Sequence, residues 1–213
     1  MSTSGLVAVL RSATHVGEKH PVERADRAAA TDTTTASSTP RGAREALAAV
    51  RVAFGLTFLW AFFDKLLALG WSAGWDPTHT HLDRFGPAAW IHGGSPTEGY
   101  LKFAVSPDNW FQGIFGAMAG QVWVDWLFMA GLLGIGVSLT LGVGMRVAAV
   151  TGTALYLMMW VSSFPLANHP FIDEHLLGAL TLVALAALGS GRTWGFERRW
   201  SQSALARRFP VLR

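Results

Sequence analysis

The stretch that decides the fold is WLFMAGLLGIGVSLTLGVGM, residues 126–145, which lies between Asp125 and Arg146 and carries no charge. Its 20 residues would form an α-helix about 30 Å long, which matches the thickness of the hydrocarbon core of a bilayer. A second uncharged run of 18 residues, 147–164, follows directly. The two runs together predict a pair of membrane-spanning helices joined by a short turn.

Two further apolar stretches extend this pair to a bundle. The chain of 213 residues is 51% hydrophobic and only 15% charged, whereas charged residues make up about a quarter of a soluble domain. We therefore expect an all-α, polytopic membrane protein with a four-transmembrane-helix bundle. The expected spans within a membrane domain at 44–195 are residues 45–69, 122–145, 146–165 and 174–190.

The segments outside the predicted spans differ in character. Residues 1–43 contain a polar run, AAATDTTTASSTP at 28–40, which is too poor in apolar residues to fold and predicts a disordered cytoplasmic tail. Residues 70–121 form a long Trp-rich extracytoplasmic loop, in which we expect two short interfacial helices, one of them starting near Ser106. Residues 196–213 form a basic cytoplasmic tail at the C-terminus.

Positively charged residues indicate the orientation of the chain in the membrane. Cytoplasmic loops of membrane proteins carry an excess of Lys and Arg. Fourteen of the 17 Lys and Arg residues lie before residue 52, at residue 146 or after residue 191, and the other three are Lys65, Arg84 and Lys102. Both termini are therefore predicted to be cytoplasmic, in a multi-pass protein of the plasma membrane. The net charge of +3 follows from this orientation and gives no evidence for binding of nucleic acid.

The composition excludes several classes of cofactor. The chain has no cysteine, which rules out disulfides, iron–sulfur clusters and thiolate zinc sites. Haem would need paired histidines on facing helices, and no predicted helix interior holds such a pair. We also expect no metal, because the only zinc pattern is a weak one. This pattern combines the His-x-His motif of His79 and His81 with two histidines far along the chain, His169 and His175.

Charged groups collect at the predicted outer end of the bundle. Arg51 and Asp64 are thirteen residues apart, only about 20 Å along a helix, so the hydrocarbon core cannot fit between them. Arg51 can extend toward the cytoplasmic interface, but Asp64 has a short side chain. Neighbouring helix residues point about 100° apart, so Asp64 and Lys65 are expected to have separate partners. Because successive spans run in opposite directions through the membrane, Asp64 and Lys65 are expected at the same end of the bundle as Asp125 and the segment 169–175.

The hypothesis is a polar pocket at this outer end, covered by the loop 70–121. A quinone headgroup needs a few donors, aromatic walls and a route from lipid, and a lipid or small acid would have similar needs. The candidate catalytic residues are Asp64, Lys65, His169, Glu174 and His175. The candidate residues for binding a quinone or lipid are Trp60, Asp125 and Asp173. As an alternative role, Asp173 and Glu174 cap the N-terminus of the fourth helix.

Small residues line one face of the second predicted helix. Ala130, Gly134, Ser138 and Gly142 recur at four-residue steps. Such a groove lets another helix approach closely, either within the bundle or in a homo-oligomer.

Three motifs carry a resemblance to a known family. Residues 51–66, RVAFGLTFLWAFFDKL, show Arg, then Gly-x-x-Phe, then a polar residue followed by Lys-Leu. Residues 134–146 are rich in glycine and end in Gly-x-x-x-Arg, and residues 189–192 read Gly-Ser-Gly-Arg. In order and spacing these motifs resemble the DoxX/DoxD-like integral membrane proteins over about residues 45–195.

The resemblance implies a four-helix membrane bundle. Some members of this family resemble a subunit of thiosulfate:quinone oxidoreductase, and others accompany redox-stress enzymes. It therefore implies a quinone-linked subunit that acts with a partner redox subunit among membrane lipids. The positions that match the family pattern are Arg51, Lys65, Arg146 and Arg192. The alternatives are a non-catalytic scaffold that recruits partner proteins and, with less support, a small-solute or proton carrier.

Overall fold

The computed structural model describes residues 39–76, 80–209 and 211. Within these ranges the protein is helical, without strands, and its one β-feature is an isolated bridge between Trp75 and Leu82. The predicted N-terminal tail lies outside the described residues as far as residue 38, as does His79. The expectation of an all-helical protein is confirmed for these residues.

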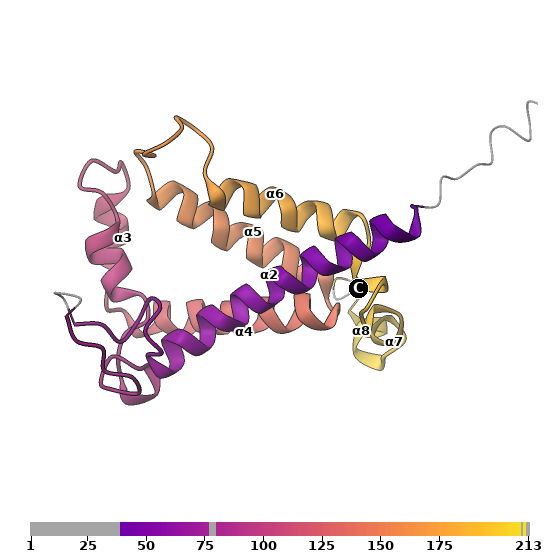
Figure 1. Ribbon diagram of the computed structural model, residues 1–213, viewed down its shortest axis with the longest axis horizontal. Helices are drawn as coiled ribbons and strands as arrows, with labels where there is room; N and C mark the ends of the chain where they lie inside the picture. The colour runs from indigo at the N-terminus through magenta and orange to yellow at the C-terminus, as the bar shows by residue number, and fades with distance from the viewer. Residues whose placement is uncertain (1–38, 77–79, 210, 212–213) are drawn as a thin grey trace, which may run out of the picture. The chain divides into compact units, whose positions relative to one another are not determined.

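In the described part of the chain, three helices are long and apolar enough to cross a membrane: α2 (Arg41–Leu67), α4 (Val122–Leu141) and α5 (Met145–Ser162) (Figure 1). The expected fourth span is a shorter apolar helix, α6 (Glu174–Ala187). Its 14 residues extend about 21 Å, less than the hydrocarbon thickness. Figure 1 shows α6 running beside α5.

Glycines in the left-handed region end the helices earlier than expected. Helix α4 stops at Leu141 because Gly142 has φ 67° and donates its N–H to the Ser138 carbonyl. Gly144, with φ 60°, then precedes α5. Gly189, with φ 61°, follows Leu188, the C-cap residue of α6. This backbone conformation costs glycine little and other residues more, which is why the chain turns at these points.

The helices form two closely packed pairs. In the α2–α4 pair, a Cβ on Gly55 would lie 2.6 Å from the Thr140 nitrogen, and one on Gly136 would lie 2.9 Å from the Leu59 nitrogen. The two backbones therefore meet at glycine, as small residues allow in membranes. Gly134, in the predicted groove, has nothing within 4 Å of such a Cβ. The contact with α2 thus uses a neighbouring face of α4.

One hydrophobic core joins both pairs. It contains buried side chains from all four apolar helices: Phe58, Phe62, Met129, Leu132, Ile135, Leu139, Met145, Ala148, Leu182 and Leu185. Large apolar side chains on the outer faces remain exposed, including Leu127, Val150 and Leu180. Apolar side chains on both the buried and the exposed faces are expected of helices that face lipid.

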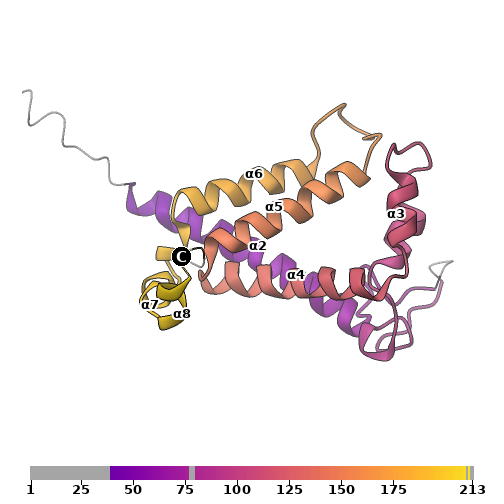
Figure 2. The same cartoon turned by 180° about the vertical axis from the view of Figure 1, so that it is seen from behind.

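The described residues between α2 and α4 form three short helical elements. They are the 3₁₀-helix η1 (Trp90–His92), the π-helix η2 (Tyr100–Ala104) and α3 (Gln112–Met118). The expectation of a helix starting near Ser106 is wrong, because Ser106 Oγ accepts the Asp108 N–H within a turn and α3 begins at Gln112. Figure 2 shows α3 lying across the space between the start of α4 and the end of α5. We call the end of the bundle at which α4 begins and α5 ends the loop end.

At the opposite end, which we call the basic end, three short helices follow α6. They are η3 (Ser190–Arg192), α7 (Glu197–Ser201) and α8 (Ala204–Arg208). The Phe196 N–H donates to the Leu141 carbonyl, which ties this segment to the end of α4.

Candidate functional site

A cavity of about 1060 Å³ lies at the loop end between α4, α5 and the segment that connects α2 to α4. Its walls are mainly apolar and include Leu101, Phe115, Met118, Phe128, Met158 and Met159. Helices α4 and α5 separate toward the loop end (Figures 1 and 2), and residues of η2 and α3 line the cavity there. Its size is at the upper limit of ligand pockets in proteins, which span roughly 300–1,000 Å³.

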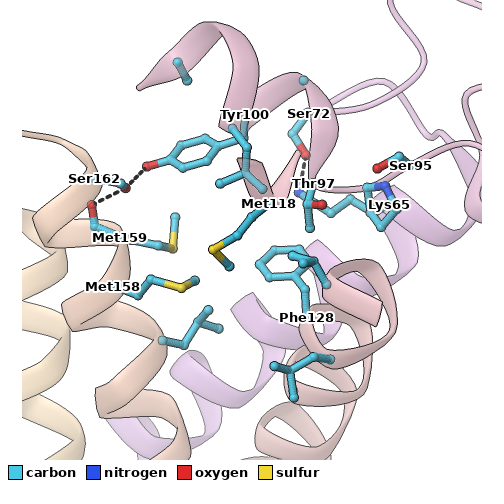
Figure 3. Close-up of a pocket in the computed structure, with 18 of the residues that line it drawn as sticks. Lys65, Ser72, Ser95, Thr97, Tyr100, Met118, Phe128, Met158, Met159 and Ser162 are labelled. Atoms are coloured by element: carbon cyan, nitrogen blue, oxygen red, sulfur yellow. Dashed lines mark hydrogen bonds between the residues drawn. The ribbon is translucent and has the colours of Figure 1, made fainter. Parts of the chain in front are cut away.

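Polar groups enter the cavity from two sides. Lys65 and Ser72 lie on one side with Ser95 and Thr97, and the Tyr100–Ser162 pair lies on the other (Figure 3). The methionine and Phe128 side chains lie between the two groups. An apolar cavity with a few polar groups on facing walls is the usual arrangement of a small-molecule site.

Lys65 and Asp64 are linked through Ser72. Lys65 Nζ donates to Ser72 Oγ at 2.8 Å, and Ser72 Oγ donates to Asp64 Oδ2 at 2.6 Å. The expectation of separate partners is therefore wrong, because the loop returns Ser72 to a position between the two side chains. Lys65 faces the cavity, with Nζ 5.9 Å from the centre of the Phe128 ring.

The Asp64 carboxylate holds the loop at the end of α2. It is 1% exposed and also accepts the backbone N–H groups of Trp71 (3.0 Å) and Ser72 (2.8 Å). These bonds explain how the short acid is tolerated near the hydrocarbon, since a buried charge needs several hydrogen bonds. Asp64 therefore positions Ser72, and through it Lys65.

Asp125 fixes another part of the cavity wall. It is buried in the first turn of α4, and its Oδ1 accepts the hydroxyls of Ser95 (2.8 Å) and Thr97 (2.6 Å). Both hydroxyl residues line the cavity. Asp125 thus anchors the loop to α4 and does not itself enter the cavity.

The far wall is closed by contacts to the end of α5. The Tyr100 and Ser162 hydroxyls lie 2.7 Å apart, and Ser162 Oγ donates to the Met159 carbonyl at 2.8 Å. Nearby, the Asn109 amide nitrogen donates to the carbonyls of Val161 (2.8 Å) and Phe164 (2.9 Å). These bonds satisfy carbonyls at a helix end and fasten the loop across the cavity.

The predicted histidine segment bonds within itself. His169 Nδ1 accepts the backbone N–H groups of Phe171 and Ile172, both at 3.0 Å. Asp173 caps α6 by accepting the Leu176 N–H at 2.9 Å, and its other oxygen lies 2.7 Å from His175 Nδ1. Capping thus accounts for Asp173, as the alternative role predicts.

The candidate residues do not meet in one site. Among the residues that the structure describes, no hydrogen bond or ion pair joins Asp64, Lys65 or Asp125 to the segment 169–175. Of the eight candidates only Lys65 lines the cavity. Trp60 is 48% exposed and its ring lies 6.0 Å from that of Trp71. His169, Glu174 and His175 are not part of the cavity wall.

Sequence reasoning missed the polar groups on the far wall. Tyr100 and Ser162 are 62 residues apart and meet only because η2 folds back onto α5. The available signal was weak: Ser162 is a hydroxyl residue near the end of an apolar run, where it needs a partner.

The Asp173–His175 contact predicts a pH-dependent contribution to stability. Burial opposes ionisation of Asp173, but hydrogen bonds from Leu176 and His175 outweigh it and lower the pKa of this carboxyl. The stabilisation is therefore present above the ordinary Asp pKa of about 3.9. It is lost as the pH falls through the lower pKa of the folded state.

Asp173→Ala should cost about 1 kcal/mol at pH 7, the usual cost of losing a cap. This difference from wild type should shrink when thermal unfolding is measured in steps from pH 5 to pH 3. The matched control is Asp108→Ala, which removes an exposed carboxylate. A difference at Asp173 that stays constant with pH would contradict the assignment.

Comparisons of the chain with protein-family models, curated proteins and solved structures give no match. What the cavity can bind therefore rests on its own geometry and chemistry.

Proposed function

We propose that the protein is a DoxX-like, quinone-binding membrane subunit of an oxidoreductase, with the quinone headgroup held in the cavity between α4 and α5. One observation carries the proposal. It is a largely apolar cavity among the membrane helices, with the Lys65 ammonium on one side and the Tyr100–Ser162 hydroxyls on the other.

The hydrogen-bonding groups suit a ring with an oxygen at each end. Lys65 Nζ carries three N–H groups, of which one is bonded to Ser72. Because Ser162 donates to Met159, the Tyr100 hydroxyl donates to Ser162 and its oxygen keeps lone pairs for a ligand donor. A hydroquinone can accept at the Lys65 side and donate at the Tyr100 side. In the oxidised quinone, the ring oxygen beside Lys65 can still accept a hydrogen bond from Lys65 Nζ.

The apolar surroundings suit the isoprenoid tail of a quinone. Leu127 and Phe103 line the cavity and are 68% and 85% exposed, so its mouth faces the surroundings of the helices. In a membrane those surroundings are lipid. Methionine side chains adapt to irregular shapes and contact aromatic rings favourably, and Met118, Met158 and Met159 all line the cavity.

A bound quinone would supply two-electron, two-proton redox chemistry at this place. The chain's own contribution is to orient the ring, to exclude water and to hold a proton at Lys65 Nζ beside one ring oxygen. The chain has no cysteine for an iron–sulfur cluster, so we assign the supply of electrons to a partner redox subunit. Asp64 and Asp125 act here as positioning residues.

The proposal includes the membrane topology that the charges predict. Both termini lie in the cytoplasm and the cavity lies in the outer half of the plasma membrane. Residues 174–190, which include α6, form the fourth span of the bundle. The residues His169, Glu174 and His175 have no part in quinone binding under this proposal.

Lys65→Met tests the polar side of the cavity. Loss of a hydrogen bond from a charged donor costs about 1.5 kcal/mol or more, so the Kd for quinone should rise roughly tenfold. The Kd is measured by quenching of tryptophan fluorescence when purified protein in lipid nanodiscs is titrated with a short-tailed quinone.

The matched control is Lys102→Met, which removes an exposed lysine paired with Glu98 and absent from the cavity wall. Equal affinities in wild type and both variants would refute the role of Lys65. No saturable binding in wild type would refute quinone binding and favour the scaffold. The carrier alternative would instead show solute or proton flux in proteoliposomes.

A further inference from the structure

A second cavity lies at the basic end of the bundle. It has a volume of about 620 Å³ and lies where α5 begins and α6 ends, beside α7. The charged residues in its wall are Arg146, Arg192, Arg198 and Glu197. None of them lines the quinone site, so the inference below does not depend on quinone binding and rests on the proposed function only for the membrane topology.

The charge of this cavity is positive. Glu197 faces the interior: its side chain is 19% exposed, its Oε2 is buried, and a Cβ on Gly191 would lie 2.7 Å from that oxygen. Its Oε1 is 3.8 Å from Arg192 Nε, at the limit of an ion pair. Arg146 and Arg198 form no ion pair with the described residues. Three exposed arginines and one partly buried carboxylate thus line this cavity.

The start of α5 lies in the same wall. Gly144 precedes the helix without a side-chain cap, and the first backbone bond of this turn runs from the Ala148 N–H to the Gly144 carbonyl. Met145 and Arg146, in the first turn, both line the cavity. The positive end of the helix dipole therefore points to the same place as the arginines, which favours an anion.

Apolar residues of α6 form one part of the wall. Ala186, Ala187 and Leu188 continue the cavity onto α6, and Leu188 is 60% exposed. Under the membrane topology of the proposed function, the start of α5 and the end of α6 lie at the depth of the lipid headgroups. We propose that this cavity binds the phosphate group of an anionic glycerophospholipid, with the glycerol and upper acyl chain against α6. Basic pockets between membrane helices bind acidic headgroups in this way.

The test is a lipid titration of the purified full-length protein in neutral detergent. The rise of the thermal midpoint with added phosphatidylglycerol gives an apparent Kd, and phosphatidylcholine serves as the zwitterionic comparison. Wild type should respond more strongly to phosphatidylglycerol. Affinity should weaken roughly fivefold for each arginine removed. The variants are single glutamine substitutions and the triple variant Arg146→Gln, Arg192→Gln and Arg198→Gln.

A charge-matched control removes three other arginines from the same part of the chain. These are Arg199→Gln, Arg207→Gln and Arg208→Gln, at positions outside the cavity wall. This control should keep the preference for phosphatidylglycerol. Lysine at the three cavity positions should restore most of it, because lysine also binds phosphate as a point charge. The single variants keep the test decisive if the triple variant does not fold.

Equal weakening in the cavity variant and the control would overturn the site, since it would show a diffuse charge effect. A response to millimolar inorganic phosphate that equals the response to phosphatidylglycerol would overturn the lipid as the source of the phosphate group. Loss of the lipid response in the cavity variants alone supports the proposal.

Discussion

Arg51→Met should destabilise the protein by about 3–5 kcal/mol, because it leaves buried carbonyls without donors. The Arg51 side chain is fully buried and bonds to the carbonyls of Leu139 and Thr140 in the last turn of α4. Its other terminal nitrogen donates to the carbonyls of Thr193 and Trp194, both at 3.1 Å. The expectation that Arg51 extends to the interface is wrong, since it instead joins three segments at the basic end.

Unfolding of the purified protein by SDS or heat measures this effect. The control Arg44→Met removes an exposed arginine from the same helix and should change stability by less than about 0.5 kcal/mol. Arg51→Lys should recover only part of the loss, because one ammonium group cannot reach both pairs of carbonyls. A methionine variant as stable as wild type would show that Arg51 is not a structural clamp.

Gly131→Trp should weaken quinone binding roughly 10- to 100-fold while leaving the fold intact. Gly131 lines the cavity, and a Cβ built on it meets nothing within 4 Å. An indole there extends into space that the ligand would fill, so the ligand must displace it or lose contacts. The same nanodisc titration gives the Kd.

Gly134→Trp is a close control for this variant. Gly134 lies on the same helix, its Cβ position is equally open, and it is not part of the cavity wall. Both variants replace a helical glycine with the same residue, so their effects on the helix cancel in the comparison. Equal affinity in the two variants would place the ligand elsewhere.

The sequence predicts much of the fold because the membrane constrains it. Long uncharged runs predict α4 and α5, whose backbone groups must bond within a helix in lipid. The ends of the helices are less predictable, because they depend on the conformation of single residues such as Gly142. The fourth span is the weakest case, since α6 has only 14 residues.

The candidate site is only partly predictable. The uncharged runs locate Asp64, Lys65 and Asp125 near a membrane boundary, where a buried charge needs partners. Depth in the membrane does not reveal which face of a helix a residue occupies. His175 lies at the same end of the bundle, yet its ring lies near Tyr156 (6.3 Å) and its Nδ1 bonds Asp173. The meeting of Tyr100 and Ser162 depends on the path of the whole loop.

Photolabelling with an azido-quinone tests the central claim most directly. The protein is labelled in native membranes, in the presence and absence of excess unlabelled quinone, and digested for mass spectrometry. The proposed site requires saturable, competed labelling on the cavity-lining parts of α4 and α5, including Phe128 and Met158, and its loss in Gly131→Trp. Labelling that is not competed, or that falls outside the cavity wall, would contradict a quinone site between these helices.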